Sequence, residues 1–325
     1  RHARALSSRS GGRHVTITVV KPGLQSTIQS RARTGMRHLG VPAGGAADPL
    51  SLALANKLLG NAWDMAAIEA TLLGPTLRFD TDTSFSLVGA TAPVTLNGAE
   101  VEPHCSRVAR SGDELVIGAA GSGARVYLAV PGGFEAQRVL GSTATNLQAG
   151  FGGHEGRALE AGDQLHIEGS VTETRSTPRE FRPPMTHGWG LRTCAAAETA
   201  LLGDESALFE SNWEVDRRAD RMGLRLGGPA LSVSSDGRMP SAGVMPGTIQ
   251  CPEDGAPYLL SVDAGTVGGY PRVAQVARAD RHLLGQLRPG DHVRLLRREP
   301  DEAVDEFRAK LDYWCKWLPD IADII

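Results

Sequence analysis

Short runs of apolar residues, separated by glycine and proline, make up most of the chain. Residues 15–20 are rich in β-branched side chains and end before Pro22, a pattern typical of a strand followed by a turn. Between residues 77 and 169 similar runs recur, for example at 125–130, which ends at Pro131. This pattern predicts a mainly β protein with few helices.

Two short motifs recur along the chain and indicate how these strands are organised. A Gly-Asp turn followed by a strand occurs at residues 112–113, 162–163 and 290–291, and this pair of residues commonly starts a hairpin strand. The tripeptide Thr-Ile-Gln at 27–29 recurs at 248–250. Because the spacings between these recurring motifs differ, the motifs indicate two related β domains rather than a repeat protein.

The boundary between the two domains is expected in a polar stretch. Residues 170–182 are dense in Ser and Thr and precede two prolines, as a linker does. We therefore expect an N-terminal β domain at 15–170 and a C-terminal β domain at 183–299. Residues 1–14 hold four arginines and no acid, which favours a disordered basic tail over a transit peptide.

Two helices interrupt the strand pattern. Asp48 is a good N-cap, Pro49 suits the first helical position, and Gly60 suits a C-terminal cap. After Pro300, apolar residues fall three and four apart, which predicts an amphipathic helix over 300–319. We expect its apolar face to pack on its own domain, with a partner interface as the alternative. The face consists of Val304, Phe307, Leu311, Trp314 and Leu318.

Composition narrows the class of protein. The chain has 325 residues, a net charge of −3 and a pI of about 6.3, so a general nucleic-acid binder is excluded. No apolar run approaches the roughly 20 residues of a membrane-spanning helix. The cysteines stand far apart without a CxxC pair, which favours free thiols in a cytoplasmic protein over disulfides and predicts no metal site. They are Cys105, Cys194, Cys251 and Cys315.

Common catalytic motifs are absent from the sequence. There is no GxxxxGK[ST] loop, no HExxH and no GxSxG. The glycine-rich stretch at 150–156 does not fit GxGxxG and is interpreted as a β loop. Motif scanning alone therefore yields only a two-domain, mainly β protein.

Several polar segments are more specific. The chain reads QSTIQ at 25–29, GVPAGGAAD at 40–48, YLAVPGG at 127–133, DRMGLRL at 220–226, GTIQCP at 247–252 and GGYP at 268–271. In this order they closely resemble the family of allophanate hydrolase subunit 2. That family includes the C subunit of bacterial 5-oxoprolinase, the KipA-like antagonist of a kinase inhibitor, and part of the urea amidolyase carboxyltransferase domain.

The resemblance implies a fold, an activity and partners. It implies two cyclophilin-like β-barrels and a KipI-like subunit, similar to allophanate hydrolase subunit 1, with the barrel-type A subunit of an oxoprolinase as a further partner. The expected function is the C subunit of an ATP-dependent 5-oxoprolinase, with ATP supplied through the complex. The alternatives are a biotin-dependent carboxyltransferase acting on urea and a non-catalytic regulator that binds the KipI-like subunit.

The same motifs supply the candidate site residues. Glutamine amides both donate and accept hydrogen bonds, and arginines offer planar forks for carboxylate or phosphate oxygens. The candidate catalytic residues are Gln29, Arg33, Asp220, Arg221 and Gln250. The candidate substrate-binding residues are Arg225, His38, Asn56, Gly268, Gly269 and Tyr270. We expect the segments that carry the arginines, and the 268–271 loop, to line one anion-binding groove.

Structural roles compete with some of these assignments. Arg221 and Arg225, four residues apart, are as well explained by an ion-pair ladder, and Asn56 is better explained as a loop brace. Two positions also depart from the family pattern, because Ser30 and Ala242 stand where acids are usual. Neither side chain replaces a carboxylate in acid–base chemistry, so catalysis is less certain than fold.

Overall fold

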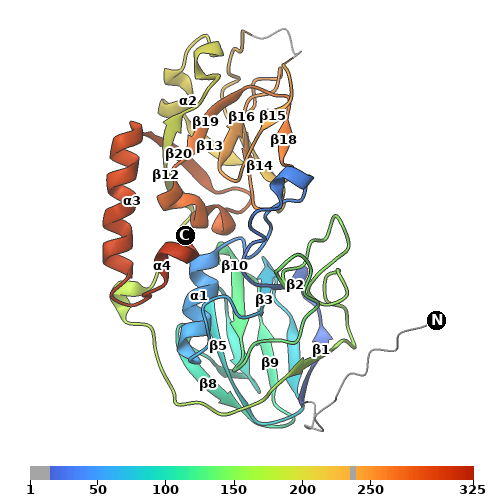
Figure 1. The fold of residues 1–325 in the computed structure, drawn as a ribbon. Coiled ribbons are helices and arrows are strands. Elements are labelled where there is room, and N and C mark those ends of the chain that lie inside the picture. Colours follow the sequence, from blue (N-terminus) through green and yellow to red (C-terminus); the bar gives the residue numbers. More distant parts are fainter. Residues whose placement is uncertain (1–14, 235–238) are drawn as a thin grey trace, which may run out of the picture.

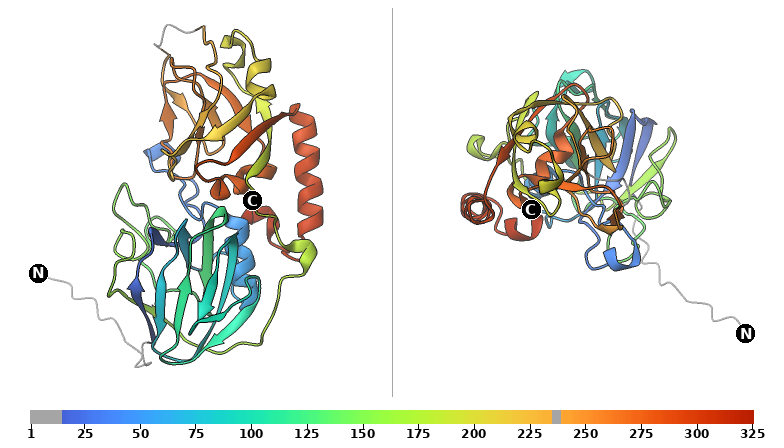
Figure 2. Two further views of the ribbon diagram at one scale, coloured as in Figure 1. Left: turned by 180° about the vertical axis from the view of Figure 1, so that it is seen from behind. Right: turned by 90° about the horizontal axis from the view of Figure 1, so that it is seen from above.

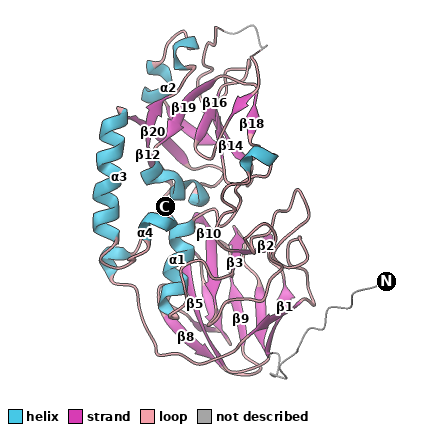
Figure 3. Ribbon diagram, viewed as in Figure 1, coloured by secondary structure: helices cyan, strands magenta, loops and turns pink. Residues whose placement is uncertain are grey.

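Two β domains stand one above the other, and a long helix runs alongside both (Figure 1). The computed structural model describes residues 15–234 and 239–325. The basic tail expected at 1–14 lies outside the described residues. Strands make up most of the regular structure, as Figure 3 shows, and the prediction of a mainly β protein with few helices is confirmed.

The N-terminal domain consists of two antiparallel sheets packed face to face. The six-stranded sheet has the order β11-β1-β4-β9-β6-β7 and the five-stranded sheet the order β2-β3-β10-β5-β8. The first contains β1 (Val15–Lys21), β4 (Thr76–Phe79), β6 (Val94–Leu96), β7 (Ala99–Glu100), β9 (Glu114–Ile117) and β11 (Gln164–Ile167). The second contains β2 (Gln25–Gln29), β3 (Ala67–Thr71), β5 (Thr83–Thr91), β8 (Ser106–Ala109) and β10 (Ser122–Ala129).

One apolar core fills the space between these sheets. Its side chains come from both, and Phe79 of β4 meets Phe85 of β5 with ring centres 5.5 Å apart. Alternate residues of β1 are buried, as Ile17 and Val19 are, which is what a strand with one wet face requires.

The C-terminal domain is a closed seven-stranded barrel. Its order is β12-β19-β16-β17-β14-β13-β20, and the parallel pairing of β12 with β20 closes it. Its strands are β12 (Gly188–Ala195), β13 (Asn212–Val215), β14 (Gly223–Gly227), β16 (Thr248–Gln250), β17 (Tyr258–Leu260), β19 (Arg272–Val276) and β20 (His292–Arg297). A separate pair, β15 (Ala242–Gly243) and β18 (Val267–Gly268), lies beside it.

The expectation of two barrels therefore needs correction. Among the described residues only the C-terminal domain forms a closed barrel. In the N-terminal domain the edge strands β11 and β7 of one sheet do not pair with the edges β2 and β8 of the other. The two sheets remain open layers, so this domain is a sandwich.

The first helix forms as predicted. α1 (Pro49–Leu58) starts after Asp48, whose carboxylate accepts a hydrogen bond from the Ser51 N–H at 3.1 Å. It packs on the outer face of the five-stranded sheet, against Val88 and Tyr127. The short helical segments are η1 (Arg37–Leu39), η2 (Arg179–Phe181), η3 (Thr199–Leu201), α2 (Ser206–Glu210) and η4 (Arg278–Gln286).

The C-terminal helix leaves the barrel and returns to the N-terminal domain. α3 (Pro300–Trp314) runs down one side of the molecule (Figure 2), and α4 (Ile321–Ile324) turns inward to lie between α3 and α1 (Figure 1). Phe307 contacts Arg278 of η4, and Phe307, Leu311 and Trp314 all pack on the apolar cluster around α1. The expected packing on its own domain is thus only part of the contact, because the apolar face of the helix also packs on the other domain.

Two further expectations concern the whole chain. The four cysteines are free thiols, as predicted. None of the helices within 15–234 and 239–325 has the length and apolar character needed to cross a bilayer.

Candidate functional site between the two domains

A buried ion-pair network joins the two domains. Arg221, two residues before β14, donates from Nε to Asp263 Oδ2 at 2.6 Å and from Nη1 to Glu69 on β3 of the N-terminal domain. Its Nη2 donates to the carbonyl of Gly45 at 2.6 Å. Arg221 is 5% exposed and Glu69 1%, so water does not compete for these contacts.

The network keeps its members ionised. Burial alone would raise the pKa of Glu69, but Arg221 and then Arg125 outweigh it and lower that pKa. Burial also disfavours the charge on Arg221, yet Asp263 and Glu69 raise its pKa. The Tyr127 hydroxyl donates to Glu69 at 2.7 Å and completes its environment. Arg221 therefore acts as a charged link between the domains.

Gln286 of η4 provides a second link. Its Nε2 donates to Asp48 Oδ2 at 2.8 Å, and its Oε1 accepts from the N–H groups of Ala124 and Arg125, both at 3.0 Å. The side chain is 1% exposed. One C-terminal glutamine thus holds both the N-cap of α1 and the backbone of β10.

Gln29 and Arg33 lie inside the N-terminal domain. Gln29 Nε2 donates to the Thr145 carbonyl at 3.2 Å, while its Oε1 is buried without a partner. Arg33 donates from Nε to the Val139 carbonyl at 3.2 Å, and its guanidinium lies 4.7 Å from the centre of the Phe151 ring. Both residues are at most 1% exposed.

The structure brings Arg33 and Arg221 together around Asp263. A Cβ built on Gly44 would lie 3.3 Å from both Arg33 Nη1 and Asp263 Oδ1, which places the three groups around this glycine. Burial lowers the pKa of Arg33, and Asp263 opposes that effect. Two of the three arginines expected to face an anion are therefore enclosed; Arg221 is held by internal acceptors, and Arg33 donates to backbone carbonyls from Nε and Nη2 while its Nη1 is buried without a partner.

The other motif residues lie elsewhere. Arg225 pairs with Asp254 at 2.8 Å on the barrel surface, and exposed Asp220 accepts from the N–H of Met222 at 2.7 Å in a turn. His38 is exposed on η1. Asn56 is fully buried and donates to the carbonyls of Trp63 and Met65 at 3.2 and 2.9 Å, as a loop brace does.

A third group gathers at the edge of the barrel. Gln250 Nε2 donates to the Tyr270 carbonyl at 3.1 Å, and Gly268 pairs with Ala242 between β18 and β15. A Cβ at Gly268 would lie 2.6 Å from Gln250 Nε2, so any larger residue here would force the Gln250 side chain to move. The Tyr270 side chain is 56% exposed, and Gly269 follows Gly268 in the same loop.

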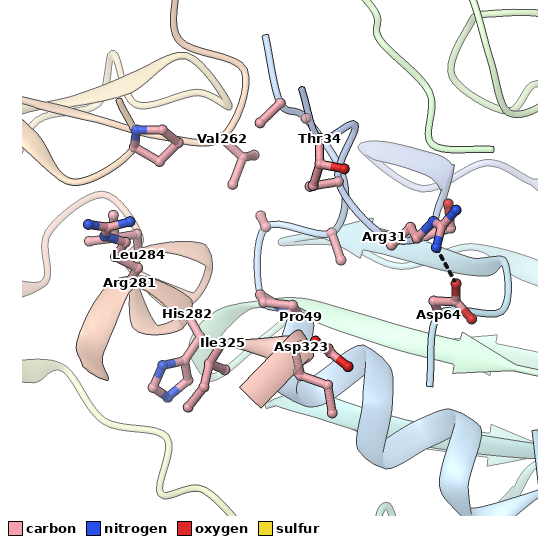
Figure 4. A pocket seen from close by; sticks show the side chains of 18 of the residues that line it. Arg31, Thr34, Pro49, Asp64, Val262, Arg281, His282, Leu284, Asp323 and Ile325 are labelled. Carbon is pink, nitrogen blue, oxygen red and sulfur yellow. Dashed lines mark ion pairs between the residues drawn. The ribbon is translucent and has the colours of Figure 1, made fainter. Parts of the chain in front are cut away.

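An interdomain cavity of about 770 Å³ lies next to the Arg221 network, since Gly44 and Ala47 line its wall. Apolar side chains such as Val262 and Leu284 make up much of the rest (Figure 4). The volume falls in the range of about 300–1,000 Å³ of small-molecule sites, so we take the cavity as the candidate site. Its charged lining consists of Arg31, Arg37, Arg278, Arg281, Asp64 and Asp323.

The cavity arginines differ in how they are paired. Arg31 faces Asp64 at 3.6 Å, and Arg278 donates to the carbonyls of Ala322 and Ile325. Arg37 donates from Nη2 to a carbonyl, but its Nη1 is buried without a partner. Arg281 forms no hydrogen bond and no ion pair with any residue that the structure describes, and its Nε is buried.

The histidine next to Arg281 also has a free nitrogen. His282 Nε2 lies 3.2 Å from Lys310 Nζ of α3, whereas His282 Nδ1 is buried without a partner. Lys310 also donates to the Ala279 carbonyl at 2.7 Å and lies 3.9 Å from Asp280 Oδ1. Burial lowers the pKa of Lys310 to about 8 and holds that of His282 well below its usual value.

Glu69 stands in the Glu-Ala-Thr run at 69–71, one of the runs that resemble the family, but its pairing is not visible there because its partner Arg221 is 152 positions away. Four other residues of the site belong to no motif that the sequence reveals. Arg281 and His282 follow two other charged residues at 278–282, and this cluster before an apolar pair was the available signal. The four are Asp263, Arg281, His282 and Lys310.

ATP phosphates, a metal ion and a small organic ligand fit the candidate site to different degrees. The N-terminus of α1, beside the cavity, is already occupied by the Asp48 carboxylate, so it offers no free site for ATP phosphates. Within the described ranges, no three His, Cys, Asp or Glu side chains come close enough together to hold a metal ion. The mixed apolar and cationic lining of the cavity fits a small organic anion or a biotin ring.

This architecture, an open sandwich and a closed barrel with a cavity between them, is that of a carboxyltransferase domain. The family model for "Carboxyltransferase domain, subdomain A and B" matches residues 39–297. The chain belongs to this family, and the resemblance drawn from its motifs is confirmed.

Known proteins of two kinds are similar to the chain. It is 34% identical to the C subunit of Escherichia coli 5-oxoprolinase over 292 residues, 89% of this chain and 93% of that protein. It is 32% identical to urea amidolyase of Saccharomyces cerevisiae over 303 residues, 86% of this chain but 16% of that protein. The crystal structure of K. lactis urea amidolyase superposes with a TM-score of 0.87 and 28% identity, over 94% of this chain and 20% of that one.

Proposed function

We propose that this chain is the C subunit of an ATP-dependent 5-oxoprolinase, which opens 5-oxoproline to L-glutamate. The observation that carries the proposal is the match to the corresponding 5-oxoprolinase protein of Escherichia coli over 93% of its length.

Within that function the interdomain cavity is the place for the substrate. The paired network of Arg221 and Glu69 fixes the walls, and the apolar side chains exclude water from a small ring. The Ser30 hydroxyl lines the cavity and accepts from the Thr143 hydroxyl at 2.8 Å. Ser30 is thus a neutral polar group, so an acid–base role at this position would have to come from another residue or from a partner subunit.

The partners follow from the same proposal. Two further proteins, one KipI-like and one of the barrel type, complete the assembly and supply the ATP site. The exposed apolar side chains of Leu39 on η1 and of Val267 and Tyr270 beside the barrel are available for such contacts.

The test is reconstitution. This chain is co-expressed with the KipI-like and barrel-type proteins, and glutamate and ADP are measured with 5-oxoproline as substrate. Turnover in the full assembly, and none when this chain is omitted, supports the proposal. A stable three-part assembly without turnover would exclude it.

The K. lactis superposition favours one second candidate, a biotin-dependent carboxyltransferase acting on urea. That reaction needs carboxybiotin from another chain, and the same cavity would hold the biotin ring. Formation of N-carboxyurea and free biotin from carboxybiotin and urea, dependent on this chain, would favour it over the first candidate.

A further inference from the structure

Two adjacent residues on one wall of the cavity present hydrogen-bond donors that nothing in the described chain uses. Arg281 has neither an ion-pair nor a hydrogen-bond partner there, and His282 Nδ1 is likewise unpartnered. Buried polar groups have a hydrogen-bond partner in the great majority of cases. Two neighbouring residues without one in the lining of a cavity therefore indicate that a ligand supplies the missing acceptors. Figure 4 shows both side chains on the wall opposite Arg31 and Asp64.

The protonation state of His282 follows from its contact with Lys310. A lysine ammonium group has three N–H donors and no acceptor. The short contact of 3.2 Å from Lys310 Nζ to His282 Nε2 therefore makes Nε2 the acceptor. Because burial and the neighbouring cations Lys310 and Arg192 keep the imidazole neutral, its one proton lies on Nδ1.

The two residues thus form a donor-only pair. Arg281 contributes a positive fork, and His282 contributes an N–H beside it. No carboxylate of the lining pairs with Arg281, because Asp64 faces Arg31 and Asp323 does not come within 4.0 Å of Arg281. The arginines Arg31, Arg37, Arg278 and Arg281 also outnumber these two aspartates in the lining. Arg37 adds a further unpartnered Nη1 from the other domain.

We propose that Arg281 and His282 form a carboxylate-binding subsite of the interdomain cavity, and that Lys310 is a positioning residue which sets the tautomer of His282. The ligand is a small carboxylate with an apolar body, because Val262, Leu284 and Pro49 surround the donors. This subsite rests on the proposed function for its preferred ligand, the carboxylate of 5-oxoproline.

Isothermal titration calorimetry on the full chain tests the subsite. The probes are L-5-oxoproline, 2-pyrrolidone, which is the same ring without the carboxylate, and acetate and bicarbonate as unrelated anions. Arg281→Gln should weaken carboxylate binding about ten- to a hundredfold and leave 2-pyrrolidone unchanged. Arg281→Lys should keep part of the affinity, and Arg107→Gln, an exposed arginine of β8, should match the wild type.

The outcomes separate the two proposals. Acetate or bicarbonate binding that depends on Arg281, without binding of 5-oxoproline, supports the subsite and counts against the 5-oxoprolinase assignment. Equal affinity of wild type and Arg281→Gln for every carboxylate, or no saturable binding of any of them, overturns the subsite. Reconstituted turnover is measured separately and stands independently of this result.

Lys310 needs a readout that a purely structural role would not change. ¹⁵N chemical shifts of the nine histidines should show one ring, absent in His282→Gln, held as the Nδ1–H tautomer. Lys310→Met should return that ring to the Nε2–H form while thermal unfolding stays cooperative. An unchanged tautomer in Lys310→Met would overturn its positioning role.

Discussion

Replacing Arg221 by methionine should destabilise the protein far more than replacing a surface arginine of the same segment. The substitution leaves Asp263 without its ion-pair partner and Glu69 with Arg125 alone, 3.3 Å away, in a place where both carboxylates are at most 6% exposed. Breaking a buried ion pair by removing one partner typically costs about 3–5 kcal/mol, because the remaining charge is left without compensation. Methionine conserves most of the volume, so packing loss contributes little.

The matched control is Arg225→Met. Arg225 pairs with Asp254, but the two side chains are 33% and 49% exposed, and such pairs contribute about 0–1 kcal/mol. Both variants are unfolded in urea and followed by tryptophan fluorescence. Trp213 lies in the barrel core and Trp314 in the α1 cluster, so both domains are reported.

A double-mutant cycle sharpens the test. Glu69→Gln removes one of the stranded charges, so in the Arg221→Met background it should restore part of the lost free energy of unfolding. A cost of Arg221→Met within about 1 kcal/mol of the Arg225→Met cost would refute the view that Arg221 is a buried interdomain link. Such a small cost would also make Arg221 a candidate ligand-binding residue again.

Three further outcomes follow from the buried groups. Burial lowers the pKa of His104 from 6.5 to about 4, so the free energy of unfolding is highest above pH 6.5 and falls as the pH drops towards 4. His104→Asn, which tolerates the local φ of +61°, should remove up to about 3 kcal/mol of this fall, measured by urea titration at pH 7 and pH 4.5. Burial lowers the pKa of Lys310 to about 8, so between pH 8 and 10.5 the unfolded chain binds a proton that the folded chain does not. The free energy of unfolding therefore rises with pH in that window, by up to about 3 kcal/mol, and Lys310→Met should abolish the rise. Trp314→Ala should cost about 3–5 kcal/mol and expose α3 to limited proteolysis, whereas Val304→Ala on the same helix, 46% exposed, should do neither.

Helix starts could be predicted from the sequence, because they depend on residues that are close together in the chain. The N-cap at Asp48 and the start of the helix after Pro300 depend on residues within a few positions of each other, and both helices begin where expected. The second helix was expected to reach residue 319, but α3 ends at Trp314. Of the apolar face that the three-and-four spacing predicted, Phe307, Leu311 and Trp314 pack on the cluster around α1, whereas Val304 is 46% exposed. The spacing could not say which domain covers that face, because most other members of the cluster come from residues 46–129 and from the segment that follows α3.

The candidate site was harder because its contacts are remote in sequence. The two Thr-Ile-Gln segments look alike, but β2 is an edge strand of an open sheet whereas β16 lies between two strands of the closed barrel. Arg221 looked like an anion ligand, and only the position of Glu69 across the domain junction shows what neutralises it. No local pattern indicates that Arg281 is left unpaired, since pairing is decided by the fold.

The return of α3 and α4 to α1 has a topological consequence. The barrel is attached to the sandwich at both ends of its own segment, through the chain that follows β11 and through Trp314 and its neighbours. If the Arg221 network opens, the barrel cannot diffuse away, and the interface re-forms as an intramolecular event at an effective concentration in the millimolar range. Damage to the junction should therefore appear as faster local opening rather than as separation of the domains.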